Sequence, residues 1–164
     1  MDLQERVATL EQRVSNLEAI EGIRNTISRY GRAVDYAQFD DLASILTDDV
    51  ILQPGPWWED QKGKEKVLSI FRDYRTTYQF PHRHAVNDLT HIDGKKGICS
   101  AYFLVMHSYH GNSYIGWGRY DWVFRLEEGI WKIAKMVINI ETMTSLEKGW
   151  GMEQDRVIPF PPPP

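Results

Sequence analysis

The N-terminal segment of the chain carries a regular apolar stripe. Its members follow one another at alternating spacings of four and three residues: Leu3, Val7, Leu10, Val14 and Leu17. This stripe predicts an amphipathic helix, with Val at one seam position and Leu at the other. It fits either a short coiled coil between subunits or a helix that lies on its own domain, because it spans fewer than about three heptads. Both interpretations stay open.

Helical spacing of apolar residues continues after this leader. It predicts a helix over residues 21–34, with Gly22 marking a break between the leader and this helix. A short helix follows within residues 39–46, for which Asp40 or Asp41 is a good N-cap. A third helix is expected over residues 64–78, because its apolar residues share one face.

Strand patterns alternate with turn signals in the rest of the chain. A short strand is expected at residues 50–52, and Trp57 and Trp58 are candidates for a second one. After Pro81 the residues favour β-structure, with turn signals at Gly94, Gly111 and Gly129. Four long strands are predicted there: 84–92, 96–109, 113–126 and 130–142.

This element order predicts an α+β fold with a mixed, mainly antiparallel sheet. A long sheet that curls round the N-terminal helices forms a cone with an open mouth, where pockets tend to form. We expect three parts: an amphipathic helix over residues 1–19, a domain over residues 20–144, and a Pro-rich tail over residues 145–164 that ends in four prolines.

Composition narrows the classes of function. The net charge of −4 and the lack of a long basic run argue against a nucleic-acid partner. The single cysteine, Cys99, excludes a disulfide framework and a cysteine-based zinc site. No apolar run approaches the roughly 20 residues of a membrane helix, and the charged N-terminus does not resemble a signal peptide. We expect a cytoplasmic protein that does not bind membranes.

Several short stretches resemble one family. Residues 23–35 and 41–50 resemble the opening signature of SnoaL-like proteins, a branch of the nuclear-transport-factor-2-like superfamily. Gly118-Arg119-Tyr120-Asp121 and the run over residues 129–133 resemble the end of its sheet. The resemblance covers roughly residues 15–143 and implies the cone fold. Within the superfamily the chain resembles the branch of scytalone dehydratase, hexachlorocyclohexane dehydrochlorinase and bile-acid 7α-dehydratase.

The resemblance implies a catalytic pair on Asp35 and a histidine. Asp35 falls at the C-terminal end of a predicted helix, where the helix dipole disfavours a carboxylate, and a broken local rule can mark a functional site. Relatives place the histidine three or four residues before a polar residue that resembles Asn87. His84 fits this spacing better than His82, and Tyr30 stands where family members place a tyrosine.

Other residues are candidates for the walls of a pocket. The aromatic content of 12% is high enough for a large core or a wide apolar pocket. Some relatives carry a further polar catalytic residue near the middle of the strand over residues 96–109, and this chain departs from them with Tyr102, Leu104 and Met106. The expected substrate-binding residues are Trp58, Tyr102, Met106, His107, Tyr120 and Asn139.

The expected activity is that of a cofactor-independent lyase, a dehydratase or dehydrohalogenase acting on a small cyclic or polycyclic substrate. His84 would remove a proton from the substrate, and Asp35 would orient His84. Tyr30 would polarise the substrate by donating a hydrogen bond to its oxygen, or would assist departure of the leaving group. An isomerase or cyclase stays open, as does a non-catalytic binding or assembly module like the small subunits of ring-hydroxylating dioxygenases.

The expected partners are few. The sequence has no glycine-rich phosphate loop, so a nucleotide cofactor is disfavoured. A metal held by His82, His84 and Asp35 is a weaker alternative. We expect no cofactor, a small hydrophobic or aromatic ligand, and a homo-oligomer, either a trimer or a dimer.

Overall fold

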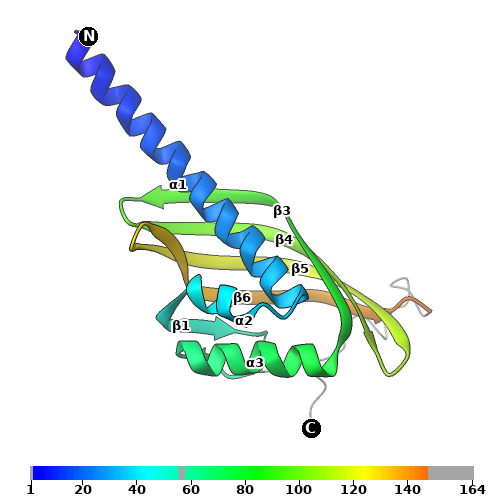
Figure 1. Cartoon of the computed structure of the whole chain (residues 1–164). Coiled ribbons are helices and arrows are strands. Elements are labelled where there is room, and N and C mark those ends of the chain that lie inside the picture. The colour runs from blue at the N-terminus through cyan, green and yellow to red at the C-terminus, as the bar shows by residue number, and fades with distance from the viewer. Residues whose placement is uncertain (1, 56–57, 148–164) are drawn as a thin grey trace.

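The computed structural model describes residues 2–55 and 58–147 (Figure 1). Helix α1 (Leu3–Asp35) is one continuous helix. Asp2 caps it through a reciprocal pair with Glu5, in which each backbone N–H donates to the other side chain. The predicted break at Gly22 is wrong, and Gly22 serves packing instead. A Cβ there would lie 2.6 Å from Trp131 Cδ1, so the glycine lets α1 approach the sheet closely.

The first half of α1 extends beyond the sheet (Figure 1). The five stripe residues from Leu3 to Leu17 are between 44% and 75% exposed. Ile23 is the first buried residue of the helix. The leader therefore does not lie on its own domain, which was one of the two open interpretations.

Six strands form one sheet in the order β2-β1-β6-β5-β4-β3. β1 runs parallel to β6, and the other neighbours are antiparallel. The predicted mixed, mainly antiparallel sheet is confirmed. The bounds are β1 (Leu46–Gln53), β2 (Gln61–Lys62), β3 (Gln79–Asp93), β4 (Lys96–Tyr109), β5 (Asn112–Glu127) and β6 (Ile130–Ser145).

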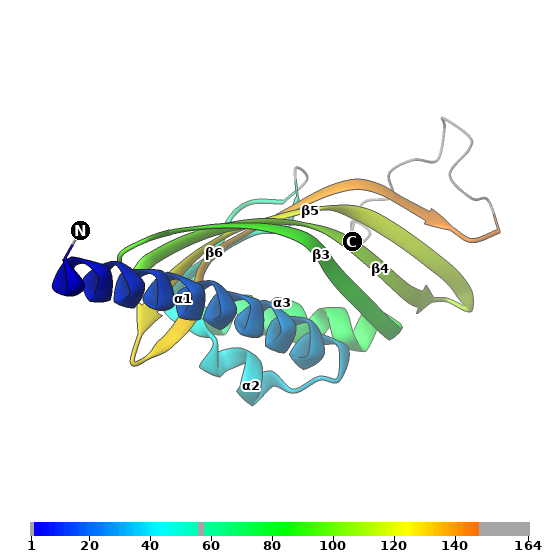
Figure 2. The ribbon, with the colours of Figure 1, turned by 90° about the horizontal axis from the view of Figure 1, so that it is seen from above.

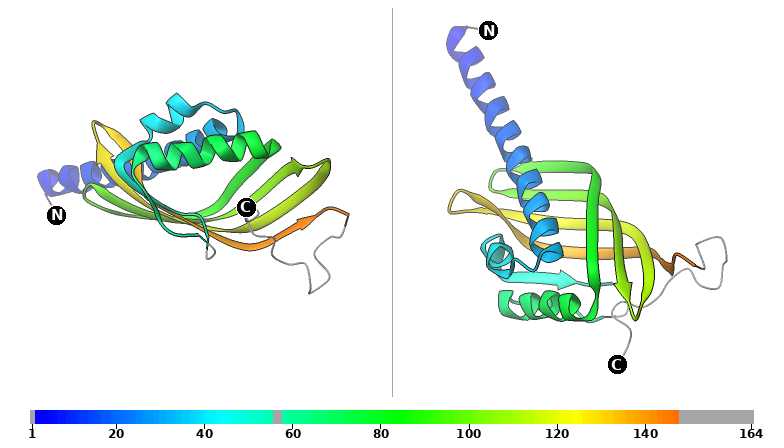
Figure 3. Two further views of the ribbon diagram at one scale, coloured as in Figure 1. Left: turned by 90° about the horizontal axis from the view of Figure 1, so that it is seen from below. Right: turned by 45° about the vertical axis from the view of Figure 1, so that its right-hand side comes forward.

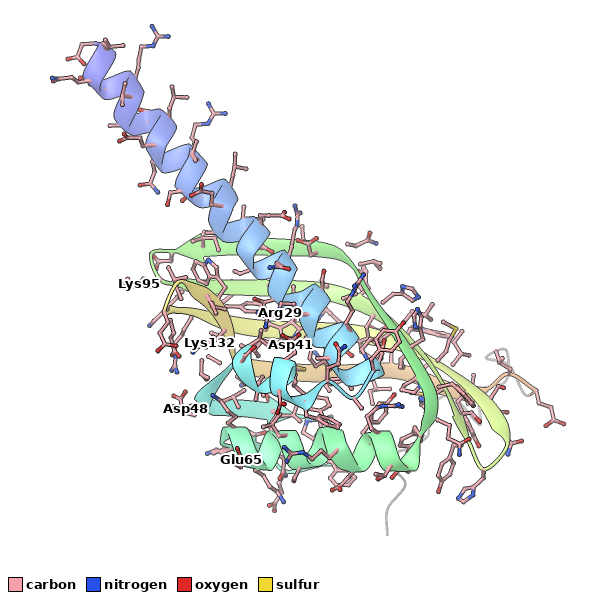
Figure 4. The ribbon with its side chains drawn as sticks, in the orientation of Figure 1. Arg29, Asp41, Asp48, Glu65, Lys95 and Lys132 are labelled. Carbon is pink, nitrogen blue, oxygen red and sulfur yellow. The ribbon has the colours of Figure 1, made fainter. Side chains whose placement is uncertain are left out.

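All three helices lie on the concave side of the curved sheet (Figure 2; Figure 3, left). These are α1, α2 (Phe39–Ser44) and α3 (Lys64–Thr77). An ion pair between Arg29 of α1 and Asp41 of α2 joins two of them, and both side chains point into the space between the helices (Figure 4). The predicted α+β cone is confirmed. No helix in the described ranges is long and apolar enough to span a membrane.

The core fills the space between helices and sheet. Along β4 every second residue points inward and is buried: Cys99, Ala101, Phe103, Val105 and His107. Tyr120, Trp122 and Phe124 do the same on β5. This period of two decides which side chains reach the interior, since successive residues of a strand face opposite sides.

Strand β3 differs most from its prediction. It begins at Gln79 rather than at residue 84, and it includes Pro81. Because β3 is the edge strand, a proline without an N–H donor is tolerated there. Its register against β4 shifts twice, and the shifts include Phe80 and Asn87, both at positive φ. Each bulge changes which residues face inward.

Two predicted segments need comment. The second short strand is β2, at Gln61–Lys62, rather than at the tryptophan pair. Trp58 is half-buried and lies outside any strand, while Trp57 lies outside the described residues. Most of the Pro-rich tail, residues 148–164, is likewise outside them.

Candidate functional site

Asp35 binds Arg83. The backbone N–H of Arg83 donates to one carboxylate oxygen of Asp35 at 3.0 Å, and Arg83 Nε donates to the other at 2.7 Å. Both side chains are buried, at 7% and 5% exposure. Asp35 ends α1, where the helix dipole disfavours a carboxylate, and the guanidinium compensates for this. These two hydrogen bonds hold the Arg83 side chain on the concave side of the sheet.

The structure does not form the predicted pair of Asp35 and His84. His82 and His84 are exposed, because they alternate with the inward-facing Arg83 on β3. His82 Nδ1 lies 4.0 Å from the Asp35 carboxylate, beyond hydrogen-bonding distance. The correction follows from strand parity: only one of these three consecutive residues faces inward, and it is Arg83.

A cavity of about 250 Å³ lies between α3 and the concave face of the sheet. Aromatic and aliphatic side chains form most of its wall. They come from α1, α3 and the inward faces of β4, β5 and β6, and include Tyr30, Phe71, Tyr74, Phe103, Tyr120 and Ile140. An apolar cavity with few polar groups is typical of a small-molecule site.

Arg83 is the one cationic group buried in the wall of this cavity among the described residues that line it. Its Nη1 donates to the Tyr30 hydroxyl at 3.3 Å, and its guanidinium lies 5.1 Å from the centre of the Tyr74 ring. Its Nη2 is buried and has no hydrogen-bond partner in the described part of the chain. An unmet donor on a buried cation is costly, so this N–H group is suited to donate a hydrogen bond to a ligand oxygen.

The tyrosines around Arg83 stay protonated. Burial raises the pKa of Tyr74 to about 12 and the pKa of Tyr120 well above its usual value. At neutral pH these phenols are hydrogen-bond donors rather than anions. Together with Arg83 they make an environment that favours negative charge on a ligand oxygen.

His107 lies in the same cavity wall, near the end of β4. Its ring lies between 4.5 and 6.3 Å from three tyrosine rings: Tyr74, Tyr78 and Tyr114. Burial lowers the pKa of His107 to about 4, with a smaller contribution from the charge of Arg83. The imidazole is therefore neutral at pH 7.

The predicted substrate-binding residues divide into two groups. Trp58, His107 and Tyr120 line the cavity, and so does the predicted catalytic Tyr30. These four side chains are therefore placed where they could contact a ligand in the cavity.

Tyr102, Met106 and Asn139 lie on the outer face of the sheet. Tyr102 is 55% exposed, and Met106 lies opposite the exposed His82. Asn139 Nδ2 donates to Asp121 at 2.7 Å rather than into the cavity. The prediction took the wrong parity of β4, whose odd-numbered residues face inward.

A second hollow of about 450 Å³ opens on the other side of Arg83. Asp35, His82 and His84 line it, while Tyr30, Arg83 and Tyr120 line both spaces. Arg83 and its tyrosine neighbours thus separate the exposed histidines from the apolar cavity. No three potential metal ligands of the His, Cys, Asp or Glu type gather anywhere in residues 2–55 and 58–147.

Comparison with known proteins identifies the family. Residues 15–137, three quarters of the chain, match the SnoaL-like domain. The chain belongs to the SnoaL-like family. No curated protein matches its sequence.

Several solved structures share the fold. A type 2 hexachlorocyclohexane dehydrochlorinase is 21% identical, with a TM-score of 0.75 over 82% of this chain and 93% of that one. A candidate scytalone dehydratase from Novosphingobium aromaticivorans is 17% identical, with a TM-score of 0.75 over 80% and 90%. A candidate aromatic ring hydroxylase from the same species is 19% identical, with a TM-score of 0.73 over 80% and 96%. At these identities the likeness shows the fold alone.

Sequence reasoning missed Arg83 as a site residue. The residue lies between the two histidines that were weighed as partners of Asp35. One signal was available in the sequence: Arg83 stands four residues before Asn87, within the spacing expected for the partner of Asp35. Arg83 was missed because only histidines were considered as partners of Asp35.

Proposed function

We propose that this SnoaL-like protein is a lyase or isomerase acting on a small, ring-containing substrate that carries a carbonyl or acidic oxygen. The observation that supports this most is the Arg83 guanidinium, which is held by Asp35 and has an unpartnered Nη2 in an apolar cavity. A substrate oxygen would satisfy that donor. The cavity volume of about 250 Å³ suits one or two rings.

The chemistry proposed for this cavity is proton abstraction. His107 takes a proton from the carbon beside the carbonyl, and the electron pair moves onto the carbonyl oxygen to give an enolate. Arg83 and the neutral phenols stabilise that negative charge. Loss of hydroxide, protonated to water by His107, or of halide then gives an alkene. Return of the proton to another carbon gives an isomer instead.

This proposal gives the base role to His107 rather than to His84. His84 is exposed and lies in the second hollow, with Arg83 between it and the cavity. Asp35 becomes a positioning residue, because it acts on a substrate only through the guanidinium that it holds. The dehydrochlorinase and the candidate dehydratase of this fold support an elimination, without deciding the substrate.

Binding of a matched pair of probes tests the Arg83 site. We expect 2-naphthoate to bind more tightly than the neutral 2-naphthamide by about tenfold or more, because an ion-paired hydrogen bond is worth about 1.5–3 kcal/mol. The double variant D35N/R83Q removes both charges together and avoids an unpaired buried carboxylate. It should lose the preference while circular dichroism shows an unchanged fold. Isothermal titration calorimetry measures both affinities.

A folded double variant that still prefers the carboxylate would contradict the role of Arg83. A wild-type protein that does not bind 2-naphthoate would contradict the acidic-oxygen site as a whole.

Turnover tests the role of His107. Hydroxylated and halogenated ring ketones are screened for alkene formation by ultraviolet absorption. With a substrate found, H107Q should lower kcat by about a hundredfold or more, the usual contribution of a general base. H84Q is the matched control and should keep near wild-type turnover. The reverse result would return the base role to His84 and Asp35.

A binding or assembly module remains the second candidate, because the predicted pair of Asp35 and a histidine is not formed. In that case the probes would bind as described, no screened ketone would turn over, and the protein would co-purify with a large subunit.

A further inference from the structure

The leader of α1 presents an apolar seam to solvent. Seam positions Leu3, Leu10 and Leu17 alternate with Val7 and Val14, and all five are exposed. With about 100° of rotation per residue, this seam lies about half a turn round the helix from Ile23, Ile27 and Tyr30, which pack on the sheet. A partner helix can therefore lie along the seam without meeting this chain's own domain.

We propose that the leaders of two copies of this chain form a parallel, in-register, two-stranded coiled coil over residues 3–20. In heptad notation Val7 and Val14 occupy a positions, while the three leucines occupy d positions. Val at a with Leu at d favours two strands over three or four. The next a and d positions are Glu21 and Arg24, so the seam ends where the helix reaches the sheet.

The flanking charges select the partner and its direction. Arg6 and Arg13 occupy g positions, while Glu11 and Glu18 occupy e positions, and all four are exposed. In a parallel pair each g residue faces the following e residue of the other helix. Arg6 then meets Glu11 of the partner subunit, and Arg13 meets Glu18 of the partner subunit. The same contacts form with the two helices exchanged.

An antiparallel pair would be repelled, because it sets g against g and e against e. Arginine would then face arginine, and glutamate would face glutamate. The leader is thus complementary to itself in one orientation only. This self-complementarity is why the occupant of the seam is a second copy and not an unrelated helix.

Sedimentation equilibrium of the full chain tests the seam. The wild type should have twice the chain mass of 19.1 kDa. L10E/L17E should sediment as a monomer, because two charges enter the seam. A8E/S15E is the matched control: it adds the same two carboxylates at b positions and should remain a dimer. A wild-type monomer, a wild-type trimer, or a dimer that L10E/L17E leaves intact would overturn the proposal.

Charge exchange tests the pairing. R6E/R13E makes every flanking charge acidic, and E11R/E18R makes every one basic. Each variant alone should have its dimer dissociation constant raised by about tenfold or more, since four attractive pairs become repulsive. An equimolar mixture should restore the dimer. Two variants that self-associate as well as the wild type would contradict the assigned pairs.

Cross-linking tests the direction. In a parallel pair the two Leu3 residues face each other, and L3C should form an intersubunit disulfide on mild oxidation. In an antiparallel pair Leu3 would instead face a residue near the other end of the partner leader, and the two Leu3 residues would lie more than about 15 Å apart along the helix axis. The native Cys99 is buried, at 3% exposure, and does not compete. Failure of L3C to cross-link in a dimeric sample would overturn the parallel arrangement.

Discussion

Arg83 shows how one side chain can decide the character of a site. It follows His82 and precedes His84, yet only Arg83 faces the interior, where it binds the buried carboxylate of Asp35. A histidine at this position could exchange a proton at neutral pH, whereas a guanidinium stays charged. In the proposed reaction Arg83 would therefore bind and polarise the substrate oxygen, and proton transfer would need another group of the same cavity.

His107 makes a prediction about stability at low pH. Its pKa is about 4 in the folded chain and 6.5 in the unfolded chain, so the unfolded chain binds the extra proton between these values. The neutral imidazole should therefore make its full contribution to the free energy of unfolding above pH 6.5. That free energy should fall as the pH is lowered towards 4, by roughly 3 kcal/mol in total. Urea unfolding at pH 7, 5.5 and 4.5 measures the slope.

H107Q should flatten this slope, because glutamine does not titrate. H84Q is the control, because the residue that it replaces, His84, is exposed and lies outside the cavity. This variant should keep the wild-type slope. Equal slopes in the wild type and H107Q would show that His107 is not the buried neutral imidazole described here.

Helix α1 shows that a glycine in a helix need not mark its end. At Gly22 the helix continues, and Trp131 of β6 occupies the space that a side chain would take. Thr26, one turn later, donates to the carbonyl of Trp131 at 2.6 Å and fixes the same contact. The glycine at position 22 is therefore explained by the close packing of α1 on the sheet, and not by an end of the helix.

Two glycines of α1 give a matched prediction. G22A should lower the free energy of unfolding by about 1–3 kcal/mol, because its Cβ would lie 2.6 Å from Trp131 Cδ1. G31A should raise it by about 0.5–1 kcal/mol, since the nearest atom, Arg83 Cγ, is 3.6 Å away and alanine favours a helix. Chemical denaturation measures both. A stabilising G22A would contradict the close contact.

On the scale of the whole molecule, the leader and the cavity are separate. The cavity is built by residues from position 30 onward, beneath the curved sheet, while the leader extends away from it (Figure 3). The leader can therefore serve association without shaping the ligand site. The two proposed functions therefore belong to different parts of the chain.

Deletion of residues 1–17 tests this separation. The shortened chain should bind 2-naphthoate within about twofold of the wild type, because residues 2–17 are exposed and line no part of the cavity. Calorimetric titration of both forms compares the affinities. A large loss of affinity in a folded, shortened chain would show that the leader contributes to the ligand site.

The sequence by itself determined the elements, the family and the cone. Hydrophobic periods of 3.6 and 2 are local properties, and so are the turn glycines that close the hairpins after β3, β4 and β5. They placed α3 and the strands β4, β5 and β6 to within a few residues. The resemblance to SnoaL-like proteins added Asp35 and Tyr30 to the candidates, and the predicted strand over residues 96–109 added His107.

Only the tertiary structure decided which side chains meet. Bulges at Phe80 and Asn87 set the facing of β3, and a shift of one residue exchanges Arg83 for a histidine. The parity of β4 likewise turned Tyr102 and Met106 outward. These choices depend on register against a neighbouring strand far away in the sequence, and no local pattern of residues contains that information.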